Sequence, residues 1–270
     1  MKIKCLFLGG LLAAGLVAHA VTEREMDSRN IESPARIMVA LPEAYAVDDA
    51  VAYPVAYLLN GHGGNYQSWS GVANLDSLAT VYNMIIVCPD GRNSWYWDSP
   101  TEPKMQMESY IIDELIPWVD ANYRTIAKPQ GRAITGFSMG GHGGLWLGLR
   151  HPDVFGNAGA TSGGVDIRPF PTRWNMADRL GKMEENPSRW DEHTVMTLME
   201  NVKPGQCNII FDCGTDDFFY EVNCKLDSLM NKRGIYHTFI TKPGAHTREY
   251  WHNSINRQLE YFYRNFYNLP

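Results

Sequence analysis

A serine flanked by glycines is the residue in this chain whose surroundings most directly indicate chemistry. Ser138 lies in Gly136-Phe137-Ser138-Met139-Gly140, after the apolar run 132–137 and before small residues typical of a helix start. A serine at such a sharp strand-to-helix turn presents its hydroxyl above the edge of a sheet, and side chains at the two glycine positions would clash there. The first amides of the following helix point toward negative charge that develops beside the serine. The motif therefore predicts Ser138 as a nucleophile in acyl transfer.

A serine hydroxyl becomes a good nucleophile only when a base removes its proton, and His246 is the predicted base. It follows the predicted strand 237–241 in the loop 242–246, at the carboxyl edge of the sheet where Ser138 also lies. His252 is the second candidate, but it falls within the helical pattern of residues 248–266. His142 follows Ser138 on the same helix, and we expect it to be packed and hydrogen-bonded instead.

Two adjacent carboxylates, Asp216 and Asp217, follow the predicted strand 208–213. A carboxylate that bonds the imidazole holds it in the tautomer that accepts the serine proton. The order serine, acid, histidine along the chain is the order expected when the nucleophile lies on a strand-turn-helix motif of this kind. Asp212 lies inside the strand and is expected to be structural, whereas the residues alone leave both Asp216 and Asp217 open as the acid.

A glycine-rich loop, Asn60-Gly61-His62-Gly63-Gly64, follows the predicted strand 54–59. Glycines allow backbone amides to approach a substrate oxygen closely, so this loop predicts part of an oxyanion hole. We expect the amide of Met139 to be one donor and the amide of His62 to be the other, with Gly63 as the alternative. A phosphate-binding loop would need Gly-Lys-Ser/Thr, which the segment lacks.

Short β-branched runs alternate with helical patterns along the chain and predict the elements that position these residues. The expected strands span residues 35–41, 54–59, 84–88, 132–137, 158–161, 208–213 and 237–241, and apolar residues at three-to-four spacing predict a helix over 108–122. Strands that are apolar on both faces suit a mostly parallel sheet. The pattern therefore predicts an α/β fold, a doubly wound sheet with helices on both faces. Residues 165–206 interrupt it, and we expect short helices over the sheet edge there, as a lid or substrate wall.

An aromatic run, Ser94-Trp95-Tyr96-Trp97-Asp98, follows the strand 84–88 and a turn. It emerges at the same sheet edge as the glycine-rich loop. Three consecutive large aromatic side chains do not all face one core, so we expect at least one to line the cleft. Trp95 and Trp97 are the predicted substrate-binding residues, and packing beneath residues 165–206 is the alternative.

The whole chain of 270 residues has 44% hydrophobic and 20% charged residues, which fits one α/β domain with a sizeable core. Its formal charge of −6 and the lack of a basic stripe argue against a nucleic-acid partner. Residues 1–20 carry two lysines, an apolar run and the small-x-small site Ala18-His19-Ala20, which predicts a signal peptide. We therefore expect residues 21–270 to form a single domain that is exported to the periplasm or outside the cell, without a membrane partner in the mature form.

Four cysteines would remain after cleavage: Cys88, Cys207, Cys213 and Cys224. No cysteine or histidine cluster has zinc-ligand spacing, so no metal site is predicted. A core of this size does not require disulfides, and we expect buried free thiols. A bridge between Cys213 and Cys224 remains an alternative, because spacing alone does not decide it.

With these features in this order, the chain resembles the esterase D-like branch of the α/β-hydrolases. This branch includes the feruloyl and acetylxylan esterases of carbohydrate esterase family 1, S-formylglutathione hydrolases and mycolyltransferases. The resemblance covers most of residues 35–265 and is carried by YPVAYLLNGHGG, SWYWDSP, ELIPWVDANYRT, GFSMGGHGG, RHPDVFG, CGTDDFFY and KPGAH. It implies an α/β-hydrolase fold, no metal or organic cofactor, and Asp217 as the acid. The family's more usual His-Gly in the oxyanion loop is Asn60-Gly61 here, which leaves the backbone donors intact.

The resemblance implies a secreted serine carboxylesterase whose partner is a small-molecule or polysaccharide-linked ester, such as a feruloyl or acetyl ester of plant polysaccharide. Acyl transfer or thioester hydrolysis would use the same catalytic residues and is the second hypothesis. A carbohydrate-binding protein on an inactive hydrolase fold is the third, and the complete set of serine, acid and histidine argues against it.

Overall fold

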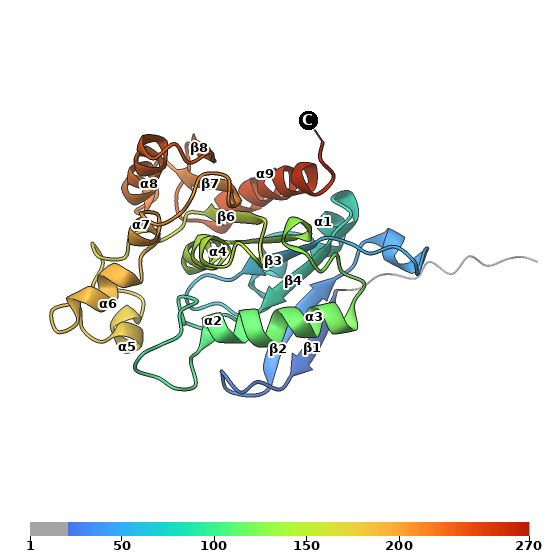
Figure 1. Ribbon diagram of the computed structural model, residues 1–270, viewed down its shortest axis with the longest axis horizontal. Coiled ribbons are helices and arrows are strands. Elements are labelled where there is room, and N and C mark those ends of the chain that lie inside the picture. Colours follow the sequence, from blue (N-terminus) through green and yellow to red (C-terminus); the bar gives the residue numbers. More distant parts are fainter. Residues whose placement is uncertain (1–20, 270) are drawn as a thin grey trace, which may run out of the picture.

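Eight strands form one sheet in the computed structural model, which describes residues 21–269 (Figure 1). They are β1 Thr22–Met26, β2 Ala35–Ala40, β3 Val55–Leu59, β4 Ile85–Pro89, β5 Arg132–Gly136, β6 Asn157–Thr161, β7 Asn208–Gly214 and β8 Thr238–Lys242. Their order across the sheet is β1-β2-β4-β3-β5-β6-β7-β8. β3 to β8 are parallel, whereas β2 is antiparallel to β1 and β4. The predicted α/β, mostly parallel sheet is confirmed; the predicted signal peptide, residues 1–20, lies outside the described residues.

The seven predicted strands correspond to β2 to β8, and β1 is the strand that the pattern missed. β1 has the sequence TEREM, and its first four residues are exposed or half-buried. A charged edge strand has no apolar run that would reveal it, and its charges also discourage pairing with other chains. By contrast, every residue of β3, β4, β5 and β6 is buried, because helices cover both faces of the sheet.

Two groups of helices cover the two faces of the sheet (Figure 1). Side chains of β3 alternate between the faces: Tyr57 belongs to one apolar cluster and Leu58 to the other. The Leu58 cluster includes α1 Leu75–Val81 and α9 Arg248–Phe266. The Tyr57 cluster includes α2 Met107–Ser109, α3 Ile116–Asn122, α4 Met139–Arg150 and α8 Tyr220–Lys232. The helix predicted over 108–122 is α2 and α3 joined by a π-helical segment, Tyr110–Leu115.

Three short helices interrupt the α/β alternation between β6 and β7, as predicted for residues 165–206. They are α5 Met176–Leu180, α6 Pro187–Glu192 and α7 Val195–Leu198. Hydrogen bonds attach this segment to the loop after β4: Trp95 Nε1 donates to Trp174 O at 3.0 Å, and Ser99 Oγ donates to Arg179 O at 2.8 Å. The segment is therefore fixed to the part of the molecule that surrounds the carboxyl ends of the strands.

Cys88, Cys207, Cys213 and Cys224 are all free thiols, so the alternative Cys213–Cys224 bridge is not formed. Three of them are buried and Cys224 is half-buried. Within the described part of the chain, no helix has the length and apolar character to cross a membrane. Among residues 21–269, no group of three or more His, Cys, Asp or Glu side chains is arranged to hold a metal ion.

Candidate active site

Ser138 lies at the junction of β5 and α4 with φ 60° and ψ −118°, the strained turn that the motif predicted. The two flanking glycines are required by close backbone packing. A Cβ on Gly136 would lie 2.6 Å from Leu59 O, and a Cβ on Gly140 would also overlap the backbone at the end of β3. Only glycine fits at either position, so the turn brings the serine hydroxyl over the sheet edge.

His246 joins Ser138 and Asp217 in one hydrogen-bonded chain. Its Nε2 lies 2.8 Å from Ser138 Oγ, and its Nδ1 lies 2.8 Å from Asp217 Oδ2. A carboxylate accepts hydrogen bonds only, so Nδ1 carries the proton and the unprotonated Nε2 of the neutral ring faces the serine hydroxyl. These are the contacts that a general base and its orienting acid require.

The backbone explains why Asp217, and not Asp216, meets the histidine. The loop after β7 runs beside the loop after β8: Thr215 N donates to Lys242 O at 3.0 Å and Asp216 N to Gly244 O at 2.9 Å. The Asp217 side chain is fully buried, and its Oδ1 accepts from Phe219 N at 2.9 Å. Asp216 is exposed. The geometry thus agrees with the choice that the resemblance implied.

The two other candidate histidines are held elsewhere. His252 Nδ1 lies 2.7 Å from Val72 O, and His142 is completely buried below the turn. Trp97 Nε1 donates to His142 Nε2 at 2.8 Å, so His142 Nδ1 carries the proton and donates to Gly164 O at 3.1 Å. Burial lowers the pKa of His142 to about 3, because the charged imidazolium would lose its hydration. The expected packed, hydrogen-bonded role of His142 agrees with this geometry.

His142 makes the stability of the protein depend on pH. Its pKa is about 3 in the folded protein against an ordinary value of 6.5. Between these values the unfolded chain binds a proton that the folded protein does not, so the free energy of unfolding falls as the pH is lowered, by at most about 1.4 kcal/mol per pH unit. In His142→Gln, whose side chain has an NH2 donor group and a carbonyl acceptor but does not titrate, we expect the free energy of unfolding from urea titrations to fall less steeply between pH 6.5 and 4. At pH 7.5 the difference in the free energy of unfolding between the variant and the wild type reports altered packing alone. The prediction would be contradicted if this free energy fell with pH at the same slope in the two proteins.

The glycine-rich loop lies directly against the serine. A Cβ on Gly61 would lie 2.6 Å from the Phe137 ring and 3.3 Å from Ser138 Cβ. Gly63 N donates to Asn93 Oδ1 at 2.7 Å, so the alternative oxyanion donor is occupied. Among the described residues, the amides of His62 and Met139 have no acceptor. The two predicted donors are therefore the ones that remain available to a substrate oxygen.

The expectation that Trp95 or Trp97 lines the cleft is wrong. Trp95 and Trp97 are 1% and 0% exposed, and Tyr96 between them is also buried. Each side chain bonds a different part of the site: Trp95 to Trp174 O, Tyr96 OH to Asn60 O at 3.0 Å, and Trp97 to His142. Left-handed backbone at Trp95 and Tyr96, with φ of 57° and 63°, points the three side chains in different directions. Trp95 and Trp97 therefore pack against residues 165–206, which was the alternative interpretation. Tyr96 supports the glycine-rich loop.

Other aromatic side chains border the histidine instead. The Phe218 ring is 4.3 Å from the His246 ring, and Phe218 is 50% exposed. Trp174, from the segment between β6 and β7, stacks on Phe218 with ring centroids 5.5 Å apart and an angle of 24°. Sequence reasoning missed this pair, although Phe218 directly follows the acid in the motif CGTDDFFY. An exposed aromatic surface next to the base can bind an apolar part of a substrate.

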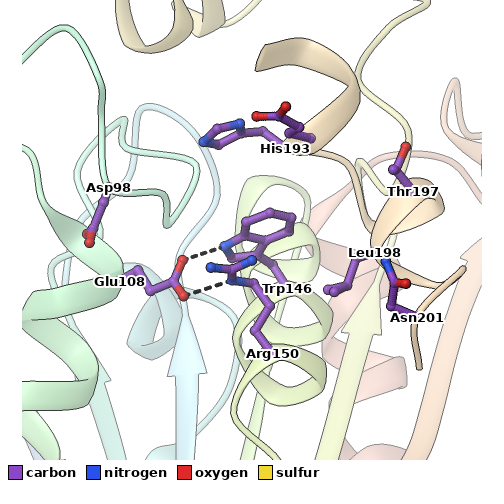
Figure 2. A pocket seen from close by; sticks show the side chains of 9 residues that line it. Asp98, Glu108, Trp146, Arg150, His193, Thr197, Leu198 and Asn201 are labelled. Atoms are coloured by element: carbon purple, nitrogen blue, oxygen red, sulfur yellow. Dashed lines mark hydrogen bonds and ion pairs between the residues drawn. The ribbon is translucent and has the colours of Figure 1, made fainter. Parts of the chain in front are cut away.

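A separate polar pocket of about 480 Å³ lies beside the C-terminal half of α4 (Figure 2). It is lined by Asp98, Glu108, Trp146, Arg150, Glu192, His193, Thr197, Leu198 and Asn201. Glu108 accepts from Trp146 Nε1 at 2.9 Å and from Arg150 Nε at 2.8 Å, as Figure 2 shows. Trp146 is eight residues beyond Ser138, about 12 Å along the helix. Ser138, Asp217 and His246 are not among the residues that line this pocket, so it is separate from them.

A family model described as "Putative esterase" matches residues 28–262. An acetyl esterase of Caldicellulosiruptor saccharolyticus is 27% identical over 217 residues, which cover 76% of this chain and 81% of that protein. An endo-1,4-beta-xylanase/feruloyl esterase of Xylanibacter ruminicola is 39% identical over 122 residues, 42% of this chain but only 17% of that protein. Among solved structures, a ferulic acid esterase superposes with a TM-score of 0.79 at 26% identity, covering 91% of this chain and 98% of that one.

Proposed function

Since this chain belongs to the putative esterase family and is a carboxylester hydrolase, we propose that Ser138, His246 and Asp217 carry out the hydrolysis. The observation that supports this most strongly is the unbroken chain of hydrogen bonds from Ser138 Oγ through both nitrogens of His246 to Asp217. No other histidine of the described residues bonds a serine hydroxyl at a strained strand-to-helix turn.

In this mechanism Ser138 Oγ attacks the ester carbonyl while His246 Nε2 removes its proton. The resulting oxyanion accepts hydrogen bonds from the amides of His62 and Met139. The imidazolium then donates its proton to the leaving alcohol, which leaves Ser138 acylated. Water attacks this acyl-enzyme with His246 again as the base, and the carboxylic acid departs. Asp217 stabilises the imidazolium and holds its orientation in both halves of the reaction.

The proposed substrate is a feruloyl or acetyl ester of plant polysaccharide. Support comes from the relatives, whose names include an acetyl esterase and feruloyl esterases, and from the aromatic pair Trp174 and Phe218 beside His246. Export, which residues 1–20 predict, would bring the enzyme to such polymers. A planar acyl group stacked on an aromatic side chain gains about 0.5–1.5 kcal/mol beyond the area that it buries.

We expect Trp174→Ala to discriminate between substrates that share a leaving alcohol. For methyl ferulate, kcat/KM should fall about 2- to 12-fold through loss of stacking, and for methyl acetate it should change less than about twofold. Trp118→Ala is the matched control, because Trp118, on α3, is half-buried and packs against the ring of Tyr123. Acetylated xylan tests the polymer directly. A preference of the wild type for long-chain acyl esters or thioesters over all three substrates would contradict the proposed substrate class.

A further inference from the structure

Two consecutive residues of the segment between β6 and β7 contact two of the loops around Ser138. Trp174 stacks on Phe218, whose ring contacts His246. On the other side, Asn175 Oδ1 lies 2.9 Å from His62 Nε2, a ring on the glycine-rich loop. Residues 174–175 therefore reach both the loop after β7, which carries the proposed acid Asp217, and the glycine-rich loop, which carries a proposed oxyanion donor.

A hydrogen bond to Asp178 determines which atom of the Asn175 amide faces His62. Asn175 Nδ2 donates to Asp178 Oδ2 at 2.7 Å, so Oδ1 faces His62 and accepts a hydrogen bond from its Nε2. Asn175 has left-handed backbone, with φ 57° and ψ 17°, and occupies the N-cap position of α5. Its side chain does not cap that helix, although asparagine commonly does so. The amide is thus directed toward the glycine-rich loop instead.

The glycine-rich loop needs such anchors. Gly61 and Gly63 flank His62, and a glycine backbone has more conformations open to it than that of any other residue. Gly63 has φ +75°, and a Cβ added there would meet nothing within 4 Å, so the space on that side of the loop is open. Backbone contacts restrain one end of this stretch: Gly61 O accepts from Gly64 N at 3.1 Å and from Asn60 Nδ2 at 2.9 Å. Contacts with other segments restrain its middle: Gly63 N donates to Asn93 Oδ1, and the His62 ring bonds Asn175.

The same segment supports both contacts. Arg179, four residues after Asn175, donates from Nε to Asn93 O at 3.0 Å. Asn93 in turn accepts from Gly63 N. Residues 175–179 therefore hold the glycine-rich loop directly through Asn175 and indirectly through the bond from Arg179 to Asn93.

We propose that Asn175 is a positioning residue that holds the His62 amide in the orientation needed to stabilise the oxyanion. This inference rests on the proposed function, in which that amide is a donor. Loss of the anchor should weaken stabilisation of the transition state more than binding of the ground state, because the oxyanion develops only during the reaction. Asn175 acts through His62 and does not itself touch the reacting atoms.

The test is Asn175→Gly, which removes the amide but keeps the left-handed backbone. We expect kcat for a 4-nitrophenyl ester to fall about 5- to 10-fold, with KM unchanged within about twofold. Asn83→Gly is the matched control: Asn83 has φ 46° and bonds Tyr267 OH through its side chain, at the other end of the sheet. This control should keep the wild-type kcat.

A double-mutant cycle shows whether Asn175 acts through the ring of His62. His62→Ala keeps the backbone amide, and the double variant with Asn175→Gly should lose no more than either single variant. Asp178→Ala frees the Asn175 amide without altering residues 174–175, and should lower kcat about 2- to 4-fold. Unchanged kcat in Asn175→Gly, or multiplying losses in the double variant, would overturn the inference. A Ser138→Ala protein is assayed in parallel. If it stays active, the proposed function is wrong; if it is inactive while Asn175→Gly keeps the wild-type kcat, only the role of Asn175 is wrong.

Discussion

Ser138→Ala is expected to lower kcat/KM for ester hydrolysis by about 10³-fold or more while the protein stays folded. The variant removes the atom that bonds the acyl group, so only the oxyanion donors and substrate binding contribute to the remaining rate. Alanine and serine differ by one oxygen, whose bond in the structure is to His246 Nε2. We therefore expect the thermal unfolding midpoint to change little. Initial rates with a 4-nitrophenyl ester and the unfolding midpoint together check this result.

Ser162→Ala is the control for that experiment. Ser162 also has left-handed backbone, with φ 50°, and is buried at the end of β6, where its Oγ accepts from Trp251 Nε1 at 3.2 Å. Loss of this hydroxyl should lower the rate by less than about tenfold, because it bonds no group in the proposed mechanism. A Ser138→Ala protein that keeps a tenth of the wild-type rate would exclude Ser138 as the nucleophile.

Asp217→Asn is expected to lower kcat about 10³- to 10⁴-fold, whereas Asp216→Asn should change it less than about threefold. An asparagine amide at position 217 would donate to His246 Nδ1, and the ring would then carry its proton on Nε2, where it cannot accept one from Ser138. Asp216 is exposed and bonds the neighbouring loop through its backbone amide, which the substitution retains.

The two aspartate variants control for one another, because the positions are adjacent in sequence and the same substitution is made at each. Thermal unfolding of Asp217→Asn is measured as well, since its carboxylate is fully buried. A larger loss in Asp216→Asn, or equal small losses in both, would assign the acid to another residue.

Sequence patterns predicted the parts of the site that local geometry dictates. The glycines around Ser138 are required by backbone contacts at the turn, so spacing alone reveals that element. His246 was predicted because it follows the last strand of a parallel sheet, and the carboxyl ends of such strands meet at one edge. The choice of Asp217 over Asp216 needed the resemblance, because the contact depends on how two loops pair.

The aromatic surroundings of the site were predicted less well because they depend on packing between distant segments. Trp95 and Trp97 are covered by residues 165–206, whose path between β6 and β7 has no repeating pattern to predict it. Trp174 and Phe218 meet only in the folded chain, 44 residues apart in sequence numbering, so no spacing links them. The bond between Asn175 and His62 spans 113 residues, and neither residue lies in a motif that indicates it.

Covalent labelling with a fluorophosphonate probe tests the central claim most directly, namely that Ser138 is a nucleophile activated by His246. The folded protein is incubated with the probe and digested, and the modified peptide is sequenced by mass spectrometry. We expect one phosphonylated residue, Ser138, with no labelling in Ser138→Ala and much slower labelling in Asp217→Asn. A folded protein that stays unlabelled, or one labelled at a different serine, would contradict the account.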